Sequence, residues 1–137
     1  MIADAFDRCA RLYQVASVCG RTFPSVGLAY RVAAVEAISA ADNTVKGFSE
    51  FMRKYVKSSG DIESLLQYLY GSARSGHFHA GAFPMGEFSR QNYFDPLIDI
   101  DTAHHDSIHR SCDDLIREAV VNWMLMMVPE PESSVPA

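Results

Sequence analysis

The chain has 137 residues, 48% hydrophobic and 21% charged, the composition of one folded domain large enough to bury a core. No apolar run approaches the roughly 18 residues of a membrane-spanning helix, and residues 1–7 carry acids where a signal peptide carries basic residues. The formal net charge of −5 excludes the broad basic surface of proteins that bind nucleic acid without regard to sequence. We expect a cytoplasmic domain over residues 1–128 with no membrane partner, and a disordered tail over 129–137.

The first two predicted helices form the N-terminal third of the chain. Apolar residues recur every three or four positions over 2–18, which predicts a helix that ends at Gly20 and the turn at 22–25. A second helix is predicted over 25–41. It is apolar on more than one face, so we expect it to be central. Glu36 is an acid inside its run of alanines and valines.

Two further helices are predicted before residue 80. The third covers 43–57, with Asp42 or Asn43 as its N-cap, and the segment 57–60 ends it. The fourth begins at Asp61, a good N-cap. Its predicted buried stripe comprises Ile62, Leu65, Leu66, Leu69, Tyr70 and Ala73.

The last part of the domain is predicted to be a loop over 80–100 and a fifth helix over 102–128. The loop contains the aromatic residues Phe83, Phe88, Tyr93 and Phe94; these could stack on bases, but we favour a role in covering the bundle. The buried side of the fifth helix is predicted to comprise Ile108, Cys112, Leu115, Ile116, Ala119, Val120, Trp123 and Met127. No segment alternates with period two, so the fold class is all-α, an antiparallel helical bundle of about five helices.

The sulfur-containing residues also point to packing. Cys9, Cys19 and Cys112 show no paired spacing, and Cys9 and Cys112 lie on apolar stripes, so we expect buried free thiols. The methionine-rich segment 124–127 is expected to lie in the core or in a dimer interface.

The stretch from Arg74 to Gly81 carries the most informative motif, an arginine and a histidine five positions apart. A permanent cation and an imidazole, which titrates near neutral pH, are groups that can handle an RNA phosphate without a metal. On an ideal α-helix, five residues rotate by about 500°, or 140° net, so Arg74 and His79 would not share a face. Either Gly76 loosens the helix locally, or each site takes residues from two subunits. We expect a dimer on this ground.

Four segments in this order and spacing, at 6–13, 29–38, 74–81 and 115–123, resemble the HEPN superfamily, and within it the Apea-like branch. The segment 29–38 is similar to that branch's alanine–leucine–glutamate helix, and Arg74 to Gly81 to its R-x4-6-H motif followed by glycine. The chain departs from many active members at Ser75, where they carry Asn, Asp or His.

The resemblance implies a helical bundle that forms a homodimer, with the two Arg–His motifs near the two-fold axis. For active members it implies metal-independent RNA cleavage without a cofactor, in proteins of the toxin or phage-defence type, some with an antitoxin partner. The alternative is a non-catalytic dimerisation module, or one that binds a nucleotide or partner, also as part of a larger defence protein.

Chemistry assigns a role to each residue of the motif. His79 is the candidate acid or base, and Arg74 can clamp two phosphate oxygens with its planar fork. Glu36 can orient Arg74, and Ser75 and His77 are candidate supports. A structural alternative stays open, in which Arg74 caps helix carbonyls or pairs with Glu36 and His79 satisfies a loop backbone group.

A metal site is the weaker alternative. His105 and His109 stand four residues apart on one predicted helix, a spacing that suits a shared metal, and His77 and His79 could add ligands. No cysteine or carboxylate pattern completes a known signature, so we expect no metal.

Overall fold

The computed structural model describes residues 2–58, 60–85, 87–88 and 100–128, with the side chains of the last range from residue 106 onward. The predicted tail, and Tyr93 and Phe94 of the predicted loop, lie outside these residues. The regular elements within them are all helical, which confirms the all-α prediction. In chain order they are α1 (Ile2–Cys19), α2 (Pro24–Ser39), α3 (Phe48–Tyr55), α4 (Ile62–Gln67), η1 (Tyr68–Ser75), α5 (Gly76–Ala80) and α6 (Ile100–Met127).

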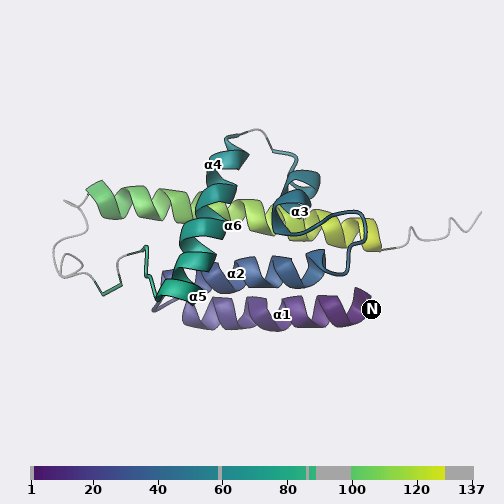
Figure 1. The fold of residues 1–137 in the computed structure, drawn as a ribbon, viewed down its shortest axis with the longest axis horizontal. Helices are drawn as coiled ribbons and strands as arrows, with labels where there is room; N and C mark the ends of the chain where they lie inside the picture. The colour runs from purple at the N-terminus through teal and green to yellow at the C-terminus, as the bar shows by residue number, and fades with distance from the viewer. Residues whose placement is uncertain (1, 59, 86, 89–99, 129–137) are drawn as a thin grey trace, which may run out of the picture.

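The helices lie in two directions. The pair α1 and α2 and the long α6 run lengthwise, while α4, η1 and α5 form one continuous stretch that crosses them (Figure 1). With that stretch counted as one, the residues that the structure describes form the five helical units predicted. None of the described helices combines the length and apolar character needed to cross a bilayer.

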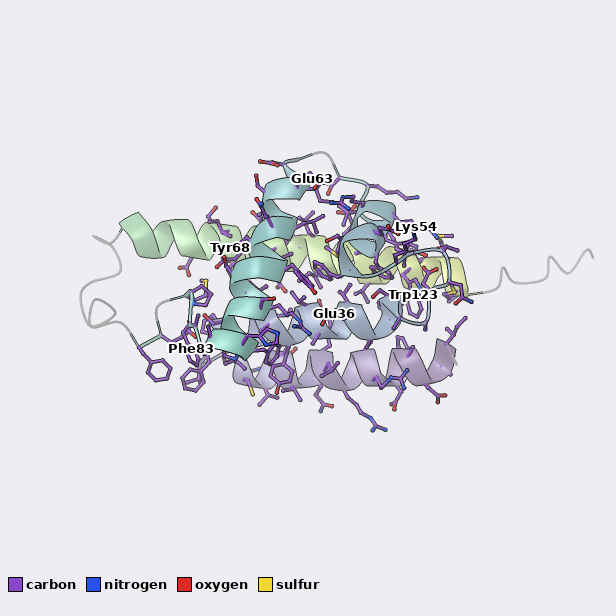
Figure 2. The ribbon with its side chains drawn as sticks, in the orientation of Figure 1. Glu36, Lys54, Glu63, Tyr68, Phe83 and Trp123 are labelled. Carbon is purple, nitrogen blue, oxygen red and sulfur yellow. The ribbon has the colours of Figure 1, made fainter. Side chains whose placement is uncertain are left out.

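Helix α2 is the central helix, as its apolar composition predicts. It packs against α1, α3, α5, α6 and η1. Leu28, Val32, Val35 and Ile38 are fully buried on it, and they join α3, η1 and α6 in one core cluster. Trp123 on α6 reaches the same cluster (Figure 2).

The connection from α1 to α2 depends on two glycines. A Cβ on Gly27 would lie 2.7 Å from the Cα of Gly20, and a Cβ on Gly20 would lie 2.6 Å from the carbonyl oxygen of Ala16. These neighbours are backbone atoms, which cannot swing aside. The two helices therefore approach closely only because both positions lack a side chain.

We predict that Gly27→Ala destabilises the fold by about 1–3 kcal/mol, the usual cost of overpacking a tight site. Urea unfolding measures the loss. Gly71→Ala is the control, because a Cβ there meets nothing within 4 Å, and a helical alanine is favoured over glycine. Equal stabilities of the two variants would contradict the close approach.

The start of the third helix differs from the prediction. It begins at Phe48 after Gly47, so neither Asp42 nor Asn43 is its N-cap. Asp42 is buried and accepts hydrogen bonds from the Thr44 amide at 2.9 Å, the Thr44 hydroxyl at 2.5 Å and the Tyr55 hydroxyl at 2.6 Å. A carboxylate that accepts from the amide and hydroxyl of the residue two positions ahead stabilises a turn instead of a helix. Burial alone would raise the pKa of Asp42, but these hydrogen bonds outweigh it and lower the pKa.

Tyr55→Phe should lower the stability at pH 7 by about 1–3 kcal/mol, because a hydrogen bond to a buried carboxylate is lost. The lowered pKa of Asp42 means that its stabilisation is present above its unfolded-state pKa, ordinarily about 3.9, and is lost as the pH falls through the folded-state value. The difference between wild type and variant should therefore narrow from pH 5 to strongly acidic pH, in urea unfolding at several pH values. The control is Tyr30→Phe, since the structure describes no hydrogen bond of that hydroxyl. A gap that stays constant in acid would contradict the assignment.

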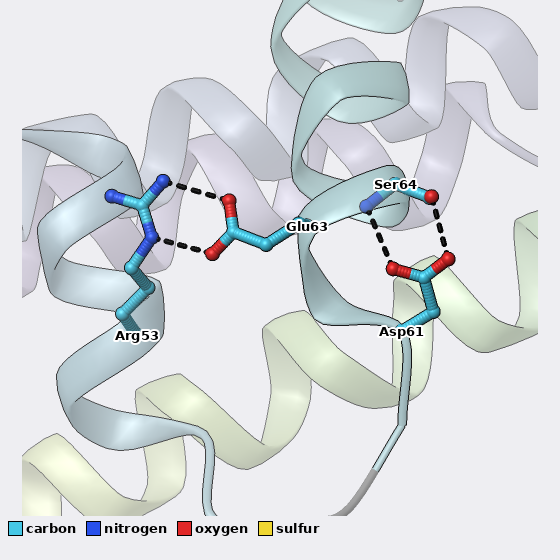
Figure 3. Close-up of polar contacts among 4 residues, drawn as sticks. All are labelled: Arg53, Asp61, Glu63 and Ser64. Atoms are coloured by element: carbon cyan, nitrogen blue, oxygen red, sulfur yellow. Dashed lines mark hydrogen bonds and ion pairs between the residues drawn. The ribbon is translucent and has the colours of Figure 1, made fainter.

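The start of α4 matches the prediction. The carboxylate of Asp61 accepts from the amide and hydroxyl of Ser64, at 3.2 and 2.6 Å (Figure 3). These bonds lower the pKa of Asp61. Two residues after Asp61, the Glu63 carboxylate accepts from Nε and a terminal nitrogen of Arg53, at 2.7 and 2.9 Å, and this contact links α3 to α4.

Helix α6 holds the segment after α3 in place. The carboxylate of Glu118 accepts from the amides of Lys57 and Ser58 and from the Ser58 hydroxyl, and these hydrogen bonds lower its pKa. Asn122 donates to the carbonyl of Tyr55 at 2.7 Å. These long-range polar contacts attach the end of α3 and the segment after it to α6.

The methionine-rich segment 124–127 does not lie in the core, since its side chains are 37–67% exposed. The buried sides predicted for the fourth and fifth helices are correct with two exceptions. Tyr70 is 46% exposed and Met127 38% exposed, because Tyr70 lies at the edge of its stripe and Met127 in the last turn of α6. Cys9 and Cys112 are buried free thiols as predicted. Burial raises their pKa values to about 11 and about 12.

Candidate functional site

The backbone around the motif is not an ordinary α-helix. Residues Tyr68–Ser75 form the π-helix η1, in which hydrogen bonds join residues five apart. At its end, the Gly76 amide donates to the carbonyl of Gly71. The Gly81 amide then donates to the carbonyls of both Gly76 and His77. Arg74 lies in the last turn of this π-helix, and His79 lies in the short α-helix α5 that follows it.

The side chains of Arg74 and His79 lie next to each other within one chain. The NH1 atom of Arg74 lies 3.5 Å from Nε2 of His79. On an ideal α-helix the two side chains would lie on different faces. Of the two ways in which we expected them to come together, a local loosening of the helix near Gly76 is the one that the backbone shows, because the Gly76 amide bonds to the carbonyl five residues back.

Glu36 fixes the orientation of Arg74 from the neighbouring helix α2 (Figure 2). Its Oε2 accepts from Nε of Arg74 at 3.0 Å, and the two side chains are 27% and 26% exposed. Since the carboxylate takes Nε, the NH1 edge of the guanidinium stays directed at His79, which is exposed. The half-buried ion pair thus holds the Arg74 guanidinium at the surface beside the His79 imidazole.

Aromatic rings frame the guanidinium. Its Cζ lies 5.9 Å from the ring centroid of Tyr70 and 5.7 Å from that of Phe78, and Tyr30 of α2 contacts Phe78 edge-on at 5.7 Å. Such cation–π contacts hold an arginine in place. The sequence analysis did not assign Phe78 to the site, although the i, i+4 spacing of residues 70, 74 and 78 is a signal that would have found it.

Ser75 and His77, the two predicted supports of the site, have different surroundings. Ser75 is the half-buried last residue of η1. His77 is turned toward the segment after α5: its Nδ1 lies 3.0 Å from the carbonyl oxygen of Ala82, and its ring contacts Phe83 edge-on at 5.0 Å. His77 therefore contacts the segment that follows the motif, and among the described contacts it has none with Arg74 or His79.

That segment is attached to the start of α2. The buried hydroxyl of Ser25 donates to Oε1 of Glu87 at 2.6 Å and accepts from the Met85 amide at 2.9 Å. Phe83 and Phe88 pack with Phe23 at centroid distances of 6.3 and 5.8 Å. Figure 2 shows Phe83 beside α5. Phe83 is thus half-buried against the bundle, as we favoured, whereas Phe88 contacts Phe23 and Phe83 but stays 70% exposed.

Among the residues described, no arrangement of side chains suits the alternative metal site. No three His, Cys, Asp or Glu side chains there are placed to hold an ion. His109 is half-buried, and its Nε2 is buried without a hydrogen-bond partner in the described part of the chain. The side chain of His105 lies outside the described residues, so the predicted pairing of His105 with His109 stays a prediction.

Comparison of this chain with protein-family models, curated proteins and solved structures finds no match. The site is therefore argued from its own geometry. A guanidinium oriented by a carboxylate and an adjacent exposed imidazole can together bind an anion and exchange a proton with it.

We predict that Glu36 and Arg74 are coupled by about 1–2 kcal/mol, between the value of an exposed ion pair and that of a fully buried one. A double-mutant cycle with Glu36→Ala, Arg74→Ala and the double variant measures this coupling by urea unfolding. The control is the cycle on Asp7 and Arg11, which form an exposed pair at 2.7 Å within α1 and should give a value close to zero. Equal coupling in the two cycles would show that Glu36 does not hold Arg74.

Proposed function

We propose that this chain is a HEPN-like domain that acts as a metal-independent endoribonuclease of the toxin or phage-defence type. The observation that carries the proposal is the 3.5 Å distance between NH1 of Arg74 and Nε2 of His79. The Nε of the same guanidinium donates to Glu36. Because the protein is acidic overall, RNA contact would be concentrated at this site. The resemblance of four segments to the superfamily supports the same function.

The proposed reaction begins with removal of the proton from a ribose 2′-hydroxyl by a base. The 2′-oxygen attacks the adjacent phosphorus, the bond to the 5′-oxygen breaks, and that oxygen leaves with a proton from an acid. The products are a 2′,3′-cyclic phosphate and a free 5′-hydroxyl. Arg74 stabilises the charge that develops on the phosphorane, and preorganised charge stabilisation of this kind is often the largest catalytic contribution.

One imidazole cannot be base and acid at the same instant. In the homodimer that we propose, a second copy brings a second His79, so that one imidazole takes the proton and the other donates one. The dimer is thus proposed for proton transfer, since one chain by itself already brings Arg74 and His79 together. An antitoxin partner belongs to the same proposal for a toxin-type protein.

Mixed RNA incubated in chelator should be cut by the wild type, with cyclic-phosphate ends detected by end analysis. His79→Ala should lower the rate by about 10²–10⁴-fold, the usual contribution of an acid–base group. Arg74→Ala should lower it by about 10²–10³-fold, as loss of a charge-stabilising donor does. Arg11→Ala, which removes an exposed arginine of α1, is the control and should cut like the wild type.

If His79→Ala and Arg74→Ala both cut RNA at the wild-type rate, the catalytic roles proposed for His79 and Arg74 are rejected. If neither wild type nor variants cut RNA and the protein is a dimer in sedimentation, the function is the second candidate, a non-catalytic dimerisation or nucleotide- or partner-binding module. A specific observation favours that candidate. Two apolar hollows between α1 and α6 adjoin at Phe6, and exposed apolar side chains stand near them: Ile2, Phe6, Val121, Met124, Leu125 and Val128.

A further inference from the structure

A groove runs around Tyr70, on the side of the crossing helix next to the proposed site. It consists of three hollows of about 510, 260 and 560 Å³, and Tyr70 lines all of them. Lys46, Gly47 and Phe48 line two. The hollows therefore adjoin one another around a single aromatic ring that is half exposed.

The proposed phosphate site lies beside one of these hollows. Glu36, which holds Nε of Arg74, also lines the hollow of about 560 Å³. The Tyr70 ring lies 5.9 Å from the guanidinium carbon of Arg74 and stacks on Phe48 at 6.1 Å with an interplanar angle of 28°. The aromatic part of the groove is thus a few ångströms from the cation, about the separation of a base from its own phosphate in a nucleotide.

The charges along the groove are largely matched by partners. Glu36 pairs with Arg74, and Arg53 pairs with Glu63. Asp42 receives its three hydrogen bonds from Thr44 and Tyr55. A groove of this kind does not attract a second phosphate in the way that a cluster of unpaired cations would.

Apart from the Lys46 ammonium and the Glu50 carboxylate, which accepts from the Lys46 amide, the surface left for a ligand is neutral, polar and aromatic. Hydroxyl and amide groups line the hollows along with the stacked rings: Ser39, Asn43, Ser49, Ser64 and Gln67. Such a surface fits a planar, uncharged ring with hydrogen-bonding edges, since bases are held by stacking on aromatic side chains and by hydrogen bonds to their edges.

We propose that the groove around Tyr70 is a nucleobase site that holds the base attached to the phosphate bound by Arg74. This inference rests on the phosphate-binding part of the proposed function and not on bond cleavage. A base in this groove cannot be paired in a duplex at the same time, so the site selects an unpaired nucleotide.

Calorimetric titration with adenosine 5′-monophosphate and with ribose 5-phosphate tests the groove. The wild type should bind the nucleotide about tenfold or more tightly than the sugar phosphate, the usual gain from one stacked base. Tyr70→Ala should abolish this difference, and any weakening that comes from the lost ring contact with Arg74 should be the same for both ligands. Tyr70→Phe should keep the preference for the nucleotide, because the ring is retained. Arg74→Ala should weaken the binding of both ligands.

A second variant protects the test against misfolding of Tyr70→Ala. Ser49 lines two of the hollows, so Ser49→Tyr should fill the groove without removing Tyr70 and should also abolish the preference for the nucleotide. Val18→Ala, at a 69% exposed position of α1, is the control and should bind both ligands like the wild type.

The outcomes separate this inference from the nuclease. Equal binding of the two ligands by the wild type, or a preference that survives in Ser49→Tyr and Tyr70→Ala, overturns the groove even if RNA cleavage depends on Arg74. A preference for the nucleotide that both variants abolish, in a protein that does not cut RNA, supports the groove and rejects the nuclease.

Discussion

The wide winding of the helix at Tyr68–Ser75 is the constraint on which the candidate site depends. An ideal α-helix would separate Arg74 and His79 by about 140° around its axis, but here the change from π-helix to α-helix lies between them, and the two side chains are 3.5 Å apart. π-Helical turns are rare and occur frequently at functional sites. The last of these bonds joins Gly76 to Gly71.

The surroundings of Arg74 explain how an acidic protein can present a local cation. Glu36 neutralises part of the charge but occupies only the Nε edge, and the rings of Tyr70 and Phe78 support the guanidinium. Because an arginine side chain has high rotamer entropy, contacts made before a ligand arrives reduce the ordering that binding requires. The same contacts place the groove around Tyr70 next to the cation.

The site lies where the crossing helix meets α2, away from the most deeply packed part of the bundle. The core of α2, α3 and α6 is joined by fully buried side chains such as Phe51 and Ile116. The polar contacts of Glu118 and Asn122 tie α6 to the segment that leads into the crossing helix. A rigid scaffold thus positions exposed functional side chains, the usual division of roles in a small domain.

Local sequence determined the helices and much of the core. The three-to-four spacing of apolar residues placed α1, α2 and α6 to within a few residues, and Asp61 was found as an N-cap because a cap needs only its own next three residues. The spacing of Arg74 and His79 marked the motif. Tertiary structure alone decided three things: the wide turn that joins this pair, the use of Asp42 by the distant Tyr55 instead of as a cap, and the groove around Tyr70, which α2, α3 and the crossing helix form together. Each of these depends on groups brought together from separate helices or on a departure from regular winding, and neither leaves a periodic signal in the chain.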